Sequence, residues 1–205
     1  MIDLYLAGTA NGFRASIALE EAGLPYRVHK VDLAKGEHRG TEFLRLNPAG
    51  LIPVIVDQDG PGGKPLTLSQ SGAIILYIAE KTGKFLPTDA ARRAIVMQWF
   101  MQGATDVVAT SGAIFRLENS VPEKSSSSID YFRQRLLGFF SVCDERLAQR
   151  EYLADELSVA DLMLYPNFAF RKALIDQAGG FANLQRWGAI MDSRPAVRKG
   201  MKVLG

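Results

Sequence analysis

The chain has 205 residues, 47% hydrophobic and 22% charged, and its 24 basic and 22 acidic residues give a net charge of +2. These values are typical of globular domains, so they predict a packed core and argue against a disordered chain. Because charges of both signs are interspersed, no binding surface for nucleic acid or anionic lipid is expected.

The first eighty residues alternate strand and helix patterns. Strands are expected at residues 2–7, 26–33, 51–56 and 66–68, and helices at 11–21, 41–46 and 70–82, with Asn11 and Ser69 as caps of the first and last helix. A helix between the first two strands makes them parallel, whereas the last two strands form a hairpin. The expected order is βαβαββα.

The strand pattern disappears after residue 82. A linker is expected at 83–88, followed by helices at 92–117, 129–150, 181–191 and 195–203 and one that opens at Ser158. Interruptions are expected at Gly103 and Gly112, a cap at Ser128 and a kink at Pro166. The fold class is therefore α/β plus all-α, with an α/β domain at 1–82 and an all-helical domain at 89–205.

The helix that opens at Ser158 carries a capping-box pattern. Ser158 and Asp161 can each accept the other's backbone amide, and Leu157 and Leu162 can pack across the turn. Such a box contributes about 1 kcal/mol locally.

Three separate features of the first domain suggest a binding site. Residues 8–12 form a strand-to-helix turn, where free amides and the helix dipole favour an anion. Pro53 is unusual inside a strand, and a cis bond before it would leave the Ile52 backbone unpaired. Gln70 and Ser71 open a helix and suit a carboxylate and a neighbouring polar group. Taken singly, these features equally fit two capped helices and an edge-strand proline.

Together the segments resemble the glutathione transferase superfamily over the whole chain. The resemblance is carried by Thr9-Ala10-Asn11-Gly12, Asn47-Pro48-Ala49-Gly50-Leu51-Ile52-Pro53, Gln70-Ser71-Gly72-Ala73-Ile74 and the Ser158–Asp161 box. The Thr-x-Asn-Gly opening is similar to the Nu-class and Ure2-like branch, many of whose members reduce disulfides with glutathione. The resemblance implies a thioredoxin-like domain at 1–82, a helical second domain and a homodimer.

The resemblance also implies which residues bind glutathione. Gln70 and Ser71 would hold the γ-glutamyl end, with Ser71 on its carboxylate. The Ile52 backbone would pair with the cysteinyl unit beside a cis Pro53, and His38 would lie near the glycyl end. The branch usually has Glu where this chain has Gln70, which removes one counter-charge for the ligand's ammonium group. Asp106, reaching across a dimer interface, would supply it; an exposed helical acid is the alternative explanation.

By the same resemblance, Thr9 and Asn11 would face the glutathione sulfur and act as the catalytic residues. A free thiol has a pKa of about 8.5, and donors from both side chains and from the helix start would stabilise the reactive thiolate. Tyr5 is an alternative thiol activator, since some relatives use a tyrosine in this strand. Relatives with a catalytic cysteine have it near position 10, where this chain has Ala10.

Cys143, the one cysteine, excludes an internal disulfide and lies on the apolar stripe of its expected helix, which favours a buried structural role. His29 and His38 lack partners at ligand spacing, so no metal is expected. The N-terminus has no basic n-region and the longest apolar run, 73–79, is short, so we expect no signal peptide and no membrane span. A cytoplasmic location follows as an expectation.

The expected function is that of a glutathione-dependent transferase or disulfide-bond reductase, with glutathione as co-substrate and a small electrophile or disulfide as partner. A tight pocket from Met97, Met101, Phe115 and Tyr165 would favour conjugation, although these residues fit a core equally well. Peroxidase activity toward organic hydroperoxides is an alternative that uses the same thiolate. A non-catalytic scaffold is the alternative from another class, because this fold also serves regulatory proteins.

Overall fold

The computed structural model describes all 205 residues and divides them into two compact units. The first unit contains Met1–Lys84 and Asp192–Gly205, and the second contains Phe85–Met191. The division expected from the sequence put residues 192–205 in the helical domain, and the structure corrects this. None of the helices is long and apolar enough to cross a lipid bilayer.

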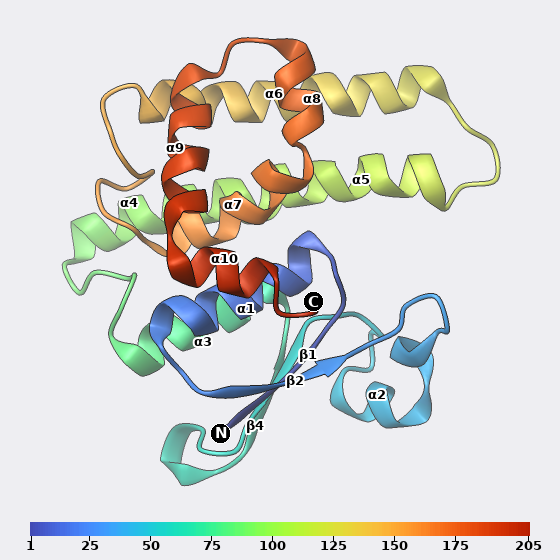
Figure 1. Cartoon of the computed structure of the whole chain (residues 1–205), viewed down its shortest axis with the longest axis vertical. Helices are drawn as coiled ribbons and strands as arrows, with labels where there is room; N and C mark the ends of the chain where they lie inside the picture. Colours follow the sequence, from blue (N-terminus) through green and yellow to red (C-terminus); the bar gives the residue numbers. More distant parts are fainter. The chain divides into compact units, whose positions relative to one another are not determined.

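The first unit is built on a four-stranded mixed sheet (Figure 1). Its strands are β1 (Ile2–Leu6), β2 (Tyr26–Lys30), β3 (Val54–Asp57) and β4 (Leu66–Ser69), in the spatial order β2-β1-β3-β4. β1 runs parallel to β2 and antiparallel to β3, and β3 runs antiparallel to β4. The parallel pair and the hairpin are therefore confirmed.

Three helices connect or follow these strands: α1 (Ala10–Ala22), α2 (Thr41–Leu46) and α3 (Ser71–Thr82), with short 3-10 segments η1 (Glu37–Arg39) and η2 (Pro61–Gly63). α1 packs against α3. The caps differ from those expected. Thr9, not Asn11, caps α1, and Gln70 occupies the cap position of α3 without a side-chain capping bond.

The last helix, α10 (Pro195–Met201), packs along α1 in the same unit. Gly200 lies so close to α1 that a Cβ there would be 2.7 Å from the Cα of Ile17. Ser16 Oγ donates to the Gly200 carbonyl oxygen at 2.8 Å, and Arg194 Nε lies 2.6 Å from Glu21 Oε1. These contacts explain why the C-terminal segment belongs to the first unit.

The second unit is entirely helical, as expected. Its helices are α4 (Ala90–Met101), the π-helical η3 (Gln102–Val107), α5 (Val108–Asn119), α6 (Ser126–Leu147), α7 (Val159–Phe170), α8 (Lys172–Ala178) and all but the last two residues of α9 (Ala182–Ser193). The interruption expected at Gly103 is the π-helical turn, whereas Gly112 lies within a continuous α5. Ser125, not Ser128, caps α6, and α8 was not predicted.

The capping box of α7 is confirmed and has a wider role than expected. The buried Asp161 carboxylate accepts from the amide and hydroxyl of Ser158 at 3.0 and 2.9 Å. It also accepts from the Leu153 amide at 3.0 Å and from the Trp187 indole at 2.9 Å. It thereby joins the start of α7 to the preceding loop and to α9. Pro166 lies inside α7 without ending it.

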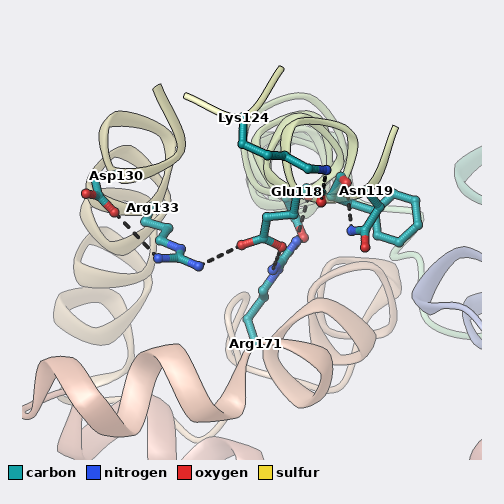
Figure 2. A network of polar contacts seen from close by, with 8 residues as sticks. Glu118, Asn119, Lys124, Asp130, Arg133 and Arg171 are labelled. Atoms are coloured by element: carbon teal, nitrogen blue, oxygen red, sulfur yellow. Dashed lines mark hydrogen bonds and ion pairs between the residues drawn. The ribbon is translucent and has the colours of Figure 1, made fainter. Parts of the chain in front are cut away.

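Two arginines converge on Glu118 at the end of α5 (Figure 2). Arg133 Nη2, from α6, lies 2.8 Å from Glu118 Oε1, and Arg171 Nη1 lies 4.0 Å from Glu118 Oε2. Arg171 sits between α7 and α8 and donates from Nε to Ser111 Oγ at 2.9 Å and from Nη2 to its carbonyl oxygen at 2.7 Å. The network connects α5 with α6 and with the α7–α8 junction.

Candidate functional site

The turn between β1 and α1 fixes the first candidate group. Thr9 has extended backbone angles, φ −129° and ψ 159°, and its Oγ1 accepts the Gly12 amide at 3.1 Å. A Cβ on Gly12 would lie 2.3 Å from the Ala7 carbonyl oxygen, so the turn requires glycine. Because the Thr9 oxygen accepts this bond, the hydroxyl proton remains available for an anion outside the helix.

Asn11 is exposed, and a buried arginine fixes its orientation. Arg14 Nη1 donates to Asn11 Oδ1. A guanidinium has donors only, so the Asn11 oxygen must face Arg14, and the Nδ2 donors point elsewhere. Arg14 is fully buried in α1. Burial lowers its pKa to about 9, which still leaves it protonated at neutral pH.

The start of α3 supplies the second candidate group. Ser71 is the first residue of the helix, is 8% exposed, and its Oγ lies 3.4 Å from Arg14 Nη1. Gln70 is exposed and has φ 71° and ψ 114°, a backbone conformation uncommon for a residue other than glycine. Arg14 therefore brings Asn11 and Ser71 to one place, although they begin different helices.

The loop before β3 forms the third group. The peptide bond between Ile52 and Pro53 is cis, as the sequence suggested. Both residues precede Val54, the first residue of β3, so the Ile52 backbone lies outside the hydrogen-bond ladder. Asn47, which is buried, holds this loop: its Nδ2 donates to the Leu51 carbonyl oxygen at 2.7 Å and its Oδ1 accepts the Ala49 amide at 3.1 Å.

His38 lies in η1, beside the same loop. A Cβ on Gly50 would be 3.1 Å from the His38 carbonyl oxygen, so the two segments touch. The His38 Nδ1 atom is buried and has no hydrogen-bond partner. An unpartnered buried nitrogen is unfavourable, and a polar ligand would satisfy it.

Tyr5 has packing partners of its own. Its ring stacks on His29 with centroids 4.4 Å apart and meets Phe43 edge-on at 6.5 Å. It packs against the buried cluster of Val31, Phe43 and Val54. These contacts give Tyr5 a structural role in the sheet.

The remaining sequence candidates lie in the second unit. Asp106 is half-buried within the π-helical turn. Cys143 is 1% exposed, and burial together with the carboxylates of Asp161 and Asp144 raises its pKa to about 12, which confirms a structural thiol.

The four residues for which the sequence left a tight pocket and a core equally open do not share one environment. Tyr165 is buried in the core beside Trp187, with ring centroids 6.1 Å apart. Met101 and Phe115 are 46% and 59% exposed, and Met97 is half-buried. Tyr165 is therefore a core residue.

Arg14 is the site residue that the sequence analysis missed. Its signal was a charged residue in the middle of a helix whose neighbours, Ala15 to Leu19, are otherwise small or apolar. Such a position predicts a buried charge, which requires partners.

The chain is similar to known proteins over nearly its whole length. Residues 10–81 match the family model of the glutathione S-transferase N-terminal domain. The chain is 37% identical to the disulfide-bond oxidoreductase YfcG of Escherichia coli, over 98% of this chain and 94% of YfcG.

Two solved structures share the fold with TM-scores of 0.91. One is a glutathione transferase from Pseudomonas putida with one glutathione disulfide bound per subunit, 33% identical over 100% of this chain and 92% of that one. The other is a glutathione transferase from Burkholderia graminis with two glutathione molecules bound per subunit, 35% identical over 99% of this chain and 88% of that one. The chain therefore belongs to the glutathione transferase superfamily, in the branch that contains YfcG and the Ure2-like proteins.

Proposed function

We propose that the chain is an enzyme that binds glutathione in its first unit and uses the glutathione thiolate to reduce disulfides. The observation that carries this proposal is the link from Asn11 through Arg14 to Ser71, because it holds polar donors from two helix starts at one site. The relatives support it, since one is named a disulfide-bond oxidoreductase and two were solved with glutathione disulfide or glutathione bound.

The binding residues have separate roles. Ser71 and the free amides at the start of α3 would hold the γ-glutamyl carboxylate, and the Gln70 side chain would contact the adjacent polar group. The Ile52 backbone beside Pro53 would pair with the cysteinyl unit, since it lies outside the sheet ladder. The buried His38 Nδ1 would accept or donate a hydrogen bond at the glycyl end.

Thr9 and Asn11 would stabilise the sulfur as an anion. A free thiol has a pKa of about 8.5, and each unit of lowering requires about 1.4 kcal/mol of preference for the thiolate. A hydrogen bond to a charged group contributes about 1.5–3 kcal/mol, so the Thr9 hydroxyl and the Asn11 amide suffice to make the thiolate dominant at neutral pH. Solvent takes the proton, and no general base is required.

Reduction would proceed by two exchange steps. The bound thiolate attacks one sulfur of the substrate disulfide, forms a mixed disulfide and releases the other sulfur as a thiolate. A second glutathione thiolate then attacks the glutathione sulfur, which releases the second substrate thiol and leaves glutathione disulfide. The protein contributes no exchanging thiol, because Cys143 is buried with a raised pKa. Conjugation of electrophiles by the same thiolate is the alternative reaction.

A homodimer is part of the same proposal. In it, Asp106 of one subunit would approach the ammonium group of glutathione bound to the other and supply the charge that Gln70 lacks. Light scattering should give a mass near twice 22.5 kDa. If Asp106→Asn leaves glutathione affinity unchanged in the dimer, Asp106 has no such role.

The experiment that tests the function compares two reactions under one set of conditions. Glutathione-dependent reduction of hydroxyethyl disulfide should be faster than conjugation of chlorodinitrobenzene. Ser71→Ala should raise the KM for glutathione in both assays, whereas the exposed Ser127→Ala, on α6, should change neither. Failure of the wild-type protein to bind glutathione would refute the proposal.

A further inference from the structure

We propose that Arg14 is a positioning residue that orients the donors of Asn11 and Ser71 toward the thiolate and the γ-glutamyl carboxylate, respectively, of bound glutathione. This inference rests on the proposed function. It assigns a task to a residue that contacts neither the sulfur nor the carboxylate in the roles described above.

One guanidinium nitrogen serves both partners. Arg14 Nη1 donates to Asn11 Oδ1 and lies 3.4 Å from Ser71 Oγ. Asn11 lies in the first turn of α1 and Ser71 is the first residue of α3, and 57 residues separate Arg14 from Ser71 in the chain. The link therefore crosses the interface between two packed helices rather than lying within one turn.

The direction of these hydrogen bonds determines which donors of Asn11 and Ser71 remain available to a ligand. Because arginine has no acceptor, both Asn11 Oδ1 and Ser71 Oγ must accept from it. The Asn11 Nδ2 group and the Ser71 hydroxyl proton are then left to donate to anions. Without Arg14, the Asn11 amide could rotate by half a turn and the Ser71 proton could turn inward, so neither donor would be held in place.

The positive charge of Arg14 also favours the binding of anions beside Asn11 and Ser71. Arg14 is fully buried, and a buried cation is costly unless hydrogen bonds and opposite charge offset it. A thiolate beside Asn11 and a carboxylate beside Ser71 would both lie near this cation. Glutathione should therefore stabilise the wild-type protein more than a variant that lacks the charge.

The test replaces Arg14 with methionine, which keeps the length of the side chain but removes its donors, and with lysine, which keeps the charge. The thiol pKa of bound glutathione is measured from the thiolate absorbance as a function of pH. It should rise by about one unit in Arg14→Met, which corresponds to a roughly tenfold smaller thiolate fraction at pH values below the pKa. Arg14→Lys should lie between Arg14→Met and the wild type. A folded Arg14→Met with the wild-type thiol pKa would overturn the inference.

Arg194→Met is the matched control. Arg194 is also in the first unit and pairs with Glu21, near the opposite end of α1 from Thr9. Its loss should lower the melting temperature without changing the thiol pKa. An equal rise in thiol pKa in Arg194→Met would show that the effect of Arg14 is merely structural, and would overturn the inference.

If Arg14→Met does not fold, a double-mutant cycle tests whether Arg14 couples Asn11 to Ser71. Asn11→Ala and Ser71→Ala leave the buried arginine intact, and their effects on glutathione affinity should be non-additive by at least about threefold if one guanidinium orients both groups. Additive effects would contradict the coupling while leaving glutathione binding itself established. A wild-type protein that does not bind glutathione would instead refute the proposed function, and this inference with it.

Discussion

The hydroxyl oxygen of Thr9 accepts the backbone amide of Gly12 at 3.1 Å, so the residue proposed to face the sulfur also caps α1. Thr9→Ala should therefore have two effects. It should lower the free energy of unfolding by about 1 kcal/mol through loss of the cap, and it should raise the thiol pKa of bound glutathione. Urea unfolding and a thiolate titration measure the two separately. Thr9→Ser should preserve both the stability and the thiol pKa of the wild-type protein. If bound glutathione has the wild-type thiol pKa in Thr9→Ala, Thr9 only caps the helix.

Asn11 is exposed and does not cap the helix, so its replacement should spare the fold. Asn11→Ala should reduce kcat for disulfide reduction about tenfold through a thiol pKa raised by about one unit. Asn11→Asp should reduce kcat further than Asn11→Ala does, because it places a negative charge where the thiolate forms. The assay is the rate at fixed pH with saturating glutathione. Equal activity in Asn11→Asp and the wild type would exclude a role for the Asn11 amide.

The buried Asp57 should give the first unit a stability that depends on pH. Burial acts to raise its pKa, but the hydrogen bonds from Lys81 and Tyr77 outweigh this effect and hold the pKa below the usual 3.8. Tyr77 donates to Asp57 Oδ2 at 2.6 Å, and Lys81 Nζ lies 2.8 Å away from the same oxygen. The stabilisation is fully present above the unfolded pKa and is lost as the pH falls through the folded one.

Tyr77→Phe tests whether the stability depends on pH through the Asp57 carboxylate. It should lower the free energy of unfolding by about 1.5–3 kcal/mol at pH 7, and the difference from the wild type should shrink below pH of about 4 as Asp57 becomes protonated. Chemical unfolding at a series of pH values provides the measurement. Tyr131→Phe, at a tyrosine that is 61% exposed, is the control and should have no effect. A Tyr77→Phe deficit that is constant from pH 7 to pH 3 would contradict this account.

Cys143 should be inert in the folded protein. Its pKa is raised to about 12 from the usual 9.0, so the thiolate fraction at pH 8 falls about a thousandfold. A thiol-specific disulfide reagent should label no cysteine in the native protein and one after unfolding. Cys143→Ala should retain glutathione-dependent turnover. Rapid native labelling accompanied by loss of activity would mean that the protein has a reactive thiol of its own.

The sheet was predictable because its signals are local. The short apolar segments bounded by glycine and proline correspond to β1 to β4, with ends displaced by up to three residues. The cis bond before Pro53 was expected from the family resemblance, because the proline by itself fits an edge strand equally well. The capping box at Ser158 and Asp161 was recognised because its spacing is fixed by the helix turn itself.

The features missed depend on contacts between distant parts of the chain or on backbone angles. The hydrogen bond between Ser16 and Gly200, which helps assign α10 to the first unit, joins residues 184 positions apart. No sequence pattern within α10 predicts this contact. The cap of α1 falls on Thr9 because the chain is still extended there, and two capping residues so close together cannot be separated by type alone. The small and apolar neighbours of Arg14 suggest a buried charge, but they do not identify its contact with Ser71, which lies 57 positions further along the chain.

The most direct test of the central claim is the thiol pKa of glutathione bound to the wild-type protein, measured by thiolate absorbance across pH 5 to pH 10. We predict a pKa at least about one unit below the free value of about 8.5, as expected if Thr9 and Asn11 donate to the sulfur. A bound thiol that titrates at the free value would contradict the proposal that this site activates glutathione.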